Sequence, residues 1–224
     1  LSLHDALPIS LLMEKNINSQ QNLKDTEIYN GYYPGKLLII MNEYFNNQKN
    51  CEKVSKNIFF WESYVSHYFS QKINYCIIMN QEGNQWVFRS GYDILPLIFK
   101  EKYTENKKII NICLDGVNEY ILAPLKDEGT RYMLKVDKLS IIEKYNECFI
   151  LTEGVLTVIF DKYLKIINYE FQTSMHKRLN NDENNDLSSL NDFGLTPQFS
   201  RTLVISEVLT EMNDSINEFI EKFN

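Results

Sequence analysis

Few side chains in this sequence could carry acid–base or nucleophilic chemistry. Outside the first ten residues the histidines are His67 and His176. His67 is expected at the edge of a helix, within reach of Ser63, Tyr64 and Ser66. A general acid or base in a pocket could be built on it. A histidine at a helix edge with hydrogen-bonding neighbours is more often structural, so we assign His67 no catalytic role.

The cysteines and carboxylates do not form a recognisable site either. The cysteines are isolated, with no C-x-x-C pair, which favours free thiols in a reducing compartment over a metal site or a disulfide framework: Cys51, Cys76, Cys113 and Cys148. Asp115, Asp137 and Asp161 fall near expected strand ends or turns, where aspartate serves the backbone. No phosphate loop, H-E-x-x-H helix or G-x-S-x-G elbow is present. The sequence therefore predicts no catalytic residue, no metal site and no cofactor.

Composition limits the classes of partner. The 224 residues carry a formal net charge of −7, which argues against nucleic acid as a direct ligand because phosphate binding rests on clustered Lys and Arg. The densest basic stretch, Lys100–Lys102 with Lys107 and Lys108, is interrupted by Glu101 and Glu105 and is typical of a solvated face. No run approaches the roughly 18 apolar residues of a membrane helix. We expect neither nucleic acid nor membrane as a direct partner.

The elements that would position these residues begin after residue 34. Residues 1–10 (LSLHDALPIS) resemble a translated sequencing adapter and are excluded from fold reasoning. Residues 11–34 are polar and expected to be disordered. Tyr33-Pro34-Gly35 then opens a helix, because apolar residues follow at helical spacing: Leu37, Ile40, Met41 and Tyr44.

The run Asn57–Ser70 holds six aromatic residues. At 100° per residue one side of this helix is an apolar arc about 180° wide, against the roughly 100° that a surface helix needs; it comprises Phe60, Trp61, Tyr64, Val65, Tyr68 and Phe69. Phe59 lies outside the arc, among polar residues. The helix has more apolar surface than one core face requires, and the surplus points toward a partner subunit.

Most of the remaining core is expected to be strand. Ile73–Asn80 and Gln85–Ser90 flank a Gly-containing loop and predict a β-hairpin. Ile94–Tyr103 predicts a short helix with Pro96 in its first turn. The later segments predict five strands, with one stretch of uncertain type from Arg131: Lys108–Gly116, Glu119–Pro124, and three strands in Cys148–Gln172 broken near Glu153-Gly154 and Asp161-Lys162.

The C-terminal part predicts a loop and then a helix. Residues 179–192 are acidic, rich in Asn and loop-like, and residues 193–224 form a helical segment. Thr196 is a plausible N-cap, with Pro197 at the first helical position. Its apolar side comprises Phe199, Leu203, Ile205, Val208, Leu209 and Met212. This order of elements is α+β, and a curved sheet with the aromatic helix on its concave side would accommodate it.

Four blocks in series resemble the LIM-domain-binding protein family, which includes Chip-like and SEUSS-like transcriptional co-regulators. They are FFWESYVSHYF; Ile94–Lys100, which resembles an "LPRYFR" block; Gly154–Phe171, which resembles "G-x-L-x-x-x-F-D-D-x-x-R-I-x-x-W-x-F"; and Asp192–Met212, with a "GL-T/S" start. One turn and two single positions depart from the family pattern. Glu105-Asn106-Lys107-Lys108 stands where the family has a Gly-rich turn. Leu97 replaces an arginine, and Tyr169 stands where a tryptophan is usual.

The resemblance implies a nuclear, non-enzymatic, homodimeric adaptor that bridges transcription factors and co-regulators. Residues 35–178 would be a dimerisation domain with a nuclear transport factor 2-like cone, an α+β fold whose curved antiparallel sheet wraps around helices. Its dimer interface would include Ile58, Phe59 and Ser63. The C-terminal segment would dock single-stranded-DNA-binding-protein-type co-regulators through protein contacts, with these anchors: Phe193, Leu195, Thr196, Phe199 and Leu203.

Three alternatives stay open, and one is that the chain is a subunit of a different regulatory assembly that uses the same domain. The C-terminal anchors could simply pack against the sheet. The same cone also hosts small-molecule isomerases, dehydratases and cyclases, since fold does not decide function. Such an enzyme would need His67 or an aspartate facing an open pocket, and a cone filled by Trp61, Tyr64 and Tyr68 would exclude it.

Overall fold

The computed structural model describes residues 32–51, 54–81, 84–103, 107–125, 129–145, 148–179, 190–191 and 193–223. The expectations for residues 1–10, for 11–31 and for most of the 179–192 loop lie outside these ranges. The elements follow one another in this order: α2 (Lys36–Lys49), α3 (Ile58–Tyr68), β1 (Phe69–Gln81), β2 (Asn84–Ser90), α4 (Leu95–Lys102), β3 (Lys107–Leu125), β4 (Gly129–Tyr145), β5 (Cys148–Phe160), β6 (Ile166–Arg178) and α5 (Pro197–Phe223).

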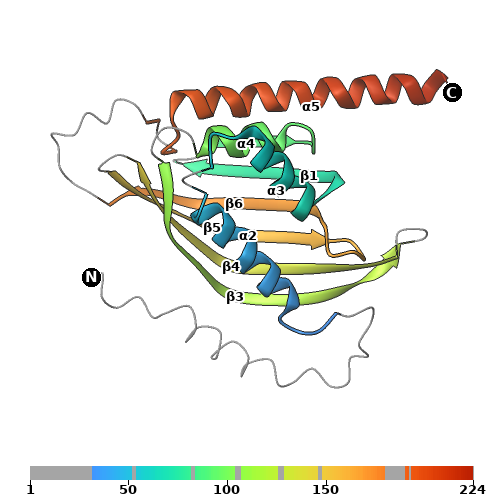
Figure 1. Cartoon of the computed structure of the whole chain (residues 1–224), viewed down its shortest axis with the longest axis horizontal. Helices are drawn as coiled ribbons and strands as arrows, with labels where there is room; N and C mark the ends of the chain where they lie inside the picture. Colours follow the sequence, from blue (N-terminus) through green and yellow to red (C-terminus); the bar gives the residue numbers. More distant parts are fainter. Residues whose placement is uncertain are drawn as a thin grey trace.

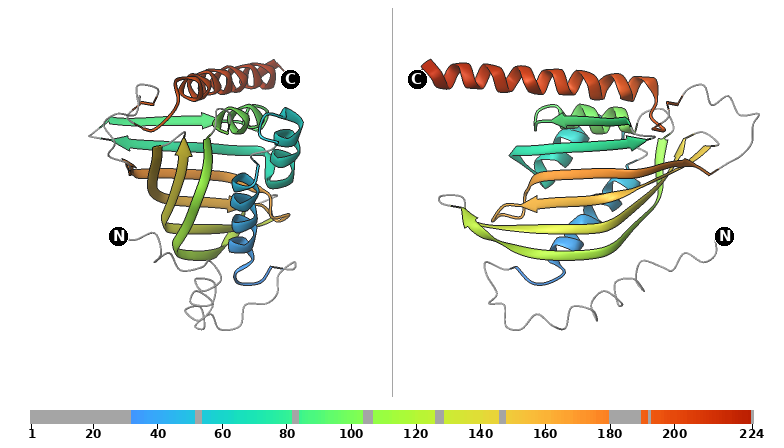
Figure 2. Two further views of the ribbon diagram at one scale, coloured as in Figure 1. Left: turned by 60° about the vertical axis from the view of Figure 1, so that its left-hand side comes forward. Right: turned by 180° about the vertical axis from the view of Figure 1, so that it is seen from behind.

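One curved, six-stranded sheet in the order β2-β1-β6-β5-β4-β3 organises the fold. Helices α2 and α3 lie on its concave side, and α5 runs along the β1–β2 edge next to α4 (Figures 1 and 2). This is the α+β cone predicted from the sequence, with its C-terminal helix.

The sequence predicted an antiparallel sheet, but one pair of neighbouring strands is parallel. Strands β1 and β6 pair in parallel, with Tyr75 opposite Tyr169. Parallel neighbours need a long connection, and here the whole stretch from β2 to β5 separates the two strands in the chain. The two halves of the sheet are therefore joined by this one parallel pair.

Several predicted strand boundaries are wrong. The expected strands Lys108–Gly116 and Glu119–Pro124 form one 19-residue strand, β3, and the segment from Arg131 is strand β4. The expected break near Glu153-Gly154 is a shift of register inside β5, not an end of the strand. Only the break after Phe160 is a turn, so Cys148–Gln172 contributes two strands instead of three.

Helix α2 starts where the sequence placed it, after Tyr33-Pro34-Gly35. Gly35 is left-handed, with a φ of 87°. The Glu119 carboxylate of β3 accepts hydrogen bonds from Gly35 N at 2.9 Å and from Leu38 N at 2.8 Å. A carboxylate at a helix N-terminus accepts hydrogen bonds from N–H groups that would otherwise be unpaired, and its negative charge interacts favourably with the helix dipole. These two hydrogen bonds attach the start of α2 to β3, the edge strand of the sheet.

The aromatic arc of α3 fills the cone. Trp61 is fully buried, and its ring stacks on Phe99 at 5.7 Å and on Tyr103 at 5.4 Å between ring centroids. Its indole Nε1 donates to Ser55 O at 2.7 Å, which satisfies the buried polar group. Phe60 is half-buried at the margin, and the other members of the arc are buried as predicted: Tyr64, Val65, Tyr68 and Phe69.

Helix α5 begins at Pro197, and Thr196 caps it: Thr196 Oγ1 accepts from Phe199 N at 3.2 Å. The predicted apolar side is only partly buried. Phe199 and Leu203 face the domain, whereas Ile205, Val208, Leu209 and Met212 are 41–55% exposed. The buried line continues instead through Ser206, whose hydroxyl bonds to Leu203 O at 2.7 Å. The residues of α5 that pack against the domain therefore lie on a different face of the helix from these exposed apolar residues.

Candidate interaction surfaces

Phe59 is the most exposed apolar side chain of α3, with 73% of its surface accessible. The helix begins at Ile58 because Asn57 caps it, accepting a hydrogen bond from Phe59 N at 3.1 Å. Since residues four apart share a helix face, Phe59 and the exposed Ser63 lie together, and Ile58 beside them is half-buried. The structure thus places the three predicted dimer-interface residues on one accessible end of α3.

The five predicted co-regulator anchors are buried within the chain: Phe193, Leu195, Thr196, Phe199 and Leu203. The ring of Phe193 contacts Trp86 at 4.9 Å and His176 at 5.8 Å between centroids. Lys107 Nζ lies over the Phe199 ring, 6.0 Å from its centroid. In this conformation no partner can reach these side chains directly. Their contacts correspond to the alternative interpretation, packing against the sheet.

Asn191 organises the chain just before α5, and sequence reasoning did not single it out. Its Oδ1 accepts hydrogen bonds from Phe193 N at 3.0 Å and from Leu195 N at 2.9 Å. Such a side-chain turn is typical of asparagine. In the sequence, this turn could have been predicted from Asn191 and the Gly-containing tetrapeptide that follows it. The turn directs Phe193 and Leu195 into the domain.

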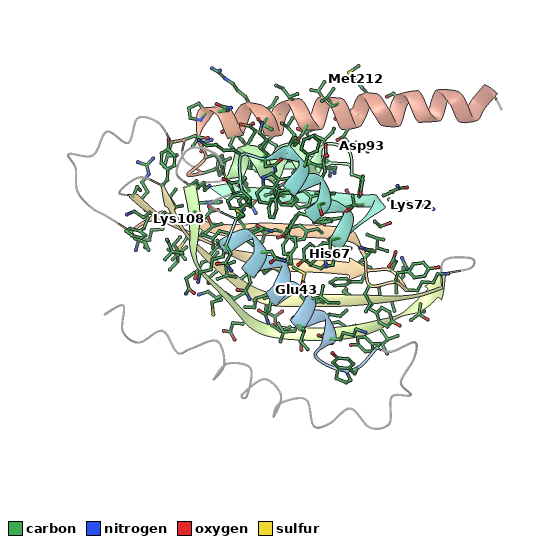
Figure 3. All side chains as sticks on the ribbon, in the orientation of Figure 1. Glu43, His67, Lys72, Asp93, Lys108 and Met212 are labelled. Carbon is green, nitrogen blue, oxygen red and sulfur yellow. The ribbon has the colours of Figure 1, made fainter. Side chains whose placement is uncertain are left out.

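An exposed apolar stripe covers the side of α5 that the domain leaves free. Its members recur at positions i, i+1, i+4, i+5 and i+8 and are each 41–55% exposed: Val204, Ile205, Val208, Leu209 and Met212. Met212 is labelled in Figure 3 on the side of α5 away from the sheet. Single exposed apolar residues need no explanation, but a contiguous row of five indicates an interaction surface.

A small cavity of about 50 Å³ lies inside the cone, among described residues. Glu143 lies at its wall, with its carboxylate 2.9 Å from Lys107 Nζ and 3.6 Å from Lys102 Nζ. Burial alone would raise the pKa of Glu143, but the two lysines outweigh it and hold that pKa below its usual range. Burial lowers the pKa of Lys102, against the pull of Glu143. The three side chains form a buried ion network.

His176 borders the same cavity from β6. Its ring nitrogens lie 3.2 Å from Thr152 Oγ1 and 3.0 Å from Thr173 Oγ1. Burial lowers the pKa of His176 to about 4, so the imidazole is neutral at pH 7. His67 lies elsewhere, on the outer side of α3, with its Nε2 3.9 Å from Glu43 Oε1 (Figure 3). His67 does not face the cavity.

Side chains of the types that bind metals do not gather in the described part of the chain. In the ranges that the structure describes, no cluster of three or more His, Cys, Asp or Glu side chains could hold an ion. Cys76 is buried on β1 and Cys113 is partly buried on β3, and burial raises the pKa of both thiols. Thiols of raised pKa are poor nucleophiles at neutral pH.

Comparison with known families decides the identity of the domain. The sequence profile of the LIM-domain binding protein family matches residues 38–184, more than half of the chain. This chain belongs to the LIM-domain binding protein family. The matched region runs from α2 to the end of the sheet, and the exposed end of α3 lies within it. Membership in a LIM-domain binding family implies protein partners.

No match was found among curated proteins. Several solved structures are similar to part of this chain. A naphthalene 1,2-dioxygenase with indole bound has 6% identity and a TM-score of 0.44, covering 73% of this chain and 92% of its own. An NTF2-like protein of unknown function from Exiguobacterium sp. 255-15 has 14% identity and a TM-score of 0.38, covering 60% of this chain and 97% of its own. An M. tuberculosis LEH-like epoxide hydrolase has 8% identity and a TM-score of 0.36, with coverages of 77% and 92%.

A helix that crosses a lipid bilayer must be long and apolar. Within the described ranges, no helix combines the length and the apolar character that crossing a membrane requires.

Proposed function

We propose that this chain is a non-enzymatic, homodimeric adaptor that acts in the nucleus and bridges transcription factors and co-regulators. The observation that carries the proposal is the 73% exposed Phe59 at the end of α3, inside a domain of the LIM-domain binding family. Dimerisation would let a transcription factor on one protomer raise the effective concentration of a factor on the other, without any chemistry.

The alternative of a small-molecule enzyme is not favoured. Pockets that bind small molecules usually have volumes of roughly 300–1,000 Å³, and the cavity beside Glu143 and His176 has about 50 Å³. Trp61, Tyr64 and Tyr68 fill the space in which a substrate would lie. The cavity's charged groups are already paired with one another, as expected of a structural network.

We place the dimer contact at Ile58, Phe59 and Ser63. When a second copy of the chain covers an exposed phenylalanine, apolar surface is removed from water, which is favourable. Substitution by lysine would put a charge into that contact. Since Phe59 contributes little to the core, the fold should tolerate this substitution.

Co-expression of two differently tagged copies tests the dimer. The wild-type copies are expected to co-purify, and Phe59→Lys in both copies is expected to abolish co-purification. Tyr33→Lys is the control, because Tyr33 is also an exposed aromatic side chain, with 50% of its surface accessible, but it precedes α2 and does not lie on α3. Undiminished co-purification of Phe59→Lys would remove the assignment, as would equal loss in both variants.

The C-terminal segment is the proposed docking element for a single-stranded-DNA-binding-protein-type co-regulator. In this proposal Phe193, Leu195, Thr196, Phe199 and Leu203 hold the start of α5 on the domain, and the exposed stripe makes the contact. An amphipathic helix that presents such a stripe can pack into a groove of a partner.

Affinity purification of the tagged full chain from nuclear extract, with identification of stoichiometric partners, tests the docking element. Val208→Glu is expected to lose a co-regulator of this class. Ile39→Glu is the control, because Ile39 lies on α2 with 49% exposure against 51% for Val208. Retention of the co-regulator by Val208→Glu would contradict the role of the stripe. A fluorescent fusion of the chain that stays outside the nucleus would contradict the proposed location.

A further inference from the structure

A second, larger hollow lies outside the cone, where the turn between β5 and β6 meets the start of β1. It is a groove of about 820 Å³. It arises from a bulge: residues 70–73 of β1 stand opposite Ile167 alone, because Phe69 pairs with Ile166 and Asn74 with Asn168. The extra residues separate β1 from β6 at this end. The irregular backbone pairing of β1 with β6 therefore accounts for the groove.

Basic side chains dominate the charge of the groove. Lys72, Arg131 and Lys162 line it, from β1, β4 and the turn, and Figure 3 labels Lys72 at this end of the sheet. The acidic lining residue, Asp161, is engaged within its own turn: Oδ1 accepts from Tyr163 N at 2.8 Å and from Lys165 N at 2.9 Å. The chain as a whole carries −7, so this concentration of positive charge runs against its composition.

Arg131 lacks a complete set of partners. Its Nε is buried and has no hydrogen-bond acceptor in the described part of the protein. A buried donor without an acceptor is costly, and a guanidinium that turns toward a carboxylate in the groove would regain one. Arginine pairs with carboxylates through two parallel hydrogen bonds, so the groove offers such a ligand a directional contact as well as charge.

The groove has a stable frame. Lys165, at the end of the turn, donates to the backbone carbonyls of Ser66, at 3.0 Å, and of His67, at the C-terminal end of α3. Ile159 and Ile167 give the lining an apolar component, and the exposed Tyr163 stands in its wall. Mixed apolar and basic lining suits an extended peptide with both carboxylate and apolar side chains.

We infer that this groove binds an acidic peptide segment of a partner protein. A nucleic acid would bring many phosphates against a chain of net negative charge, whereas a short acidic segment needs only the three local cations. The groove is separate from Phe59 and from the α5 stripe, so the inference does not rest on the proposed dimer or co-regulator contact. It gives the domain a third interaction surface.

Fluorescence anisotropy with the full chain tests the inference. The probe is a labelled peptide of sequence Glu-Glu-Leu-Glu-Glu-Leu-Glu-Glu, and the same peptide with Gln in place of every Glu is the uncharged comparison. Lys72→Gln/Lys162→Gln removes two exposed groove charges, and Lys49→Gln/Lys56→Gln removes two exposed charges elsewhere. At low ionic strength we expect saturable binding that the groove variant weakens about five- to tenfold and the control leaves unchanged.

The inference fails if the acidic peptide shows no saturable binding, if the Gln peptide binds equally well, or if both double variants weaken binding alike. Competition separates the other anion classes. Displacement of the peptide by inorganic phosphate or by a single-stranded oligonucleotide at lower concentration than by unlabelled peptide would assign the groove to that ligand and overturn the peptide assignment. Circular dichroism of both double variants is expected to match the wild type, since all four lysines are exposed.

Discussion

Gly154 lies where the backbones of β5 and β6 approach each other closely. A Cβ at this position would lie 2.2 Å from Gln172 O and 2.7 Å from Thr173 Cα, and these are backbone atoms that cannot turn away. We predict that Gly154→Ala lowers the free energy of unfolding by about 2–3 kcal/mol through overpacking. Gly91→Ala is the control, because nothing lies within 4 Å of the added Cβ, and its effect should stay within about 0.5 kcal/mol. Urea unfolding measures both, and equal effects would contradict the prediction.

His176 gives the domain an acid-sensitive contact. Burial lowers its pKa to about 4 from an ordinary 6.5, so between these pH values the unfolded chain binds a proton that the folded chain does not. Stability must then fall as the pH is lowered through this window. Glu143 from β4 and Lys107 from β3 act on the ring, with opposite signs. The slope of the unfolding free energy against pH measures how many protons the chain takes up when it unfolds. We predict that His176→Gln lowers this number by about one at most between pH 6.5 and 4.

Urea unfolding at several pH values checks the effect of His176. The carboxylate of Glu143, whose pKa its lysines hold below the usual range, is expected to lose its contribution to stability only as the pH falls below the ordinary value of 4.5. Parallel stability curves for the wild type and His176→Gln throughout the window would show that the imidazole does not titrate as inferred.

Individual residues also show where sequence reasoning reaches its limit. A helical wheel was enough to separate Phe59 from the aromatic arc, because period and residue type alone decide that question. The fate of Phe199 and Leu203 could not be decided in this way. A wheel identifies an apolar face, but whether that face meets the same chain or a partner depends on the path of the chain before it, here the turn at Asn191.

At the scale of elements, the start of α5 depends on Thr196. Its side chain satisfies Phe199 N, and loss of an N-cap costs about 1 kcal/mol. We predict that Thr196→Ala increases hydrogen exchange in the first turn of α5. Thr202→Ala is the control: the Thr202 hydroxyl bonds to Gln198 O at 3.1 Å within the helix, where alanine is favourable. Equal exchange in the two variants would contradict the capping role.

The helices were predicted more accurately than the strands for a physical reason. Caps and apolar periodicity are local, so Gly35 and Thr196 mark helix starts in the sequence. Bulges such as the one at Gly154, and the parallel pairing of β1 with β6, arise from contacts between segments far apart in the chain. The stretch from Arg131 had no clear type because its two faces alternate only in part, with Asp137 and Lys138 both exposed where the register shifts.

For the whole molecule, the proposed surfaces lie on different elements. Phe59 lies on α3, the apolar stripe on α5, and the basic groove between β1 and the β5–β6 turn. An adaptor needs such separation, because two partners can then bind at once without excluding each other. The packed cone supports this role by holding the surfaces in fixed relation, since α3 and the groove are joined through Lys165.

Sedimentation velocity of the purified full chain, over a range of concentrations, tests the central claim most directly. The account predicts a species of twice the 26.5 kDa chain mass for the wild type and a folded monomer for Phe59→Lys. A wild-type chain that sediments as a 26.5 kDa monomer at every concentration, or a Phe59→Lys variant that remains a dimer, would contradict it.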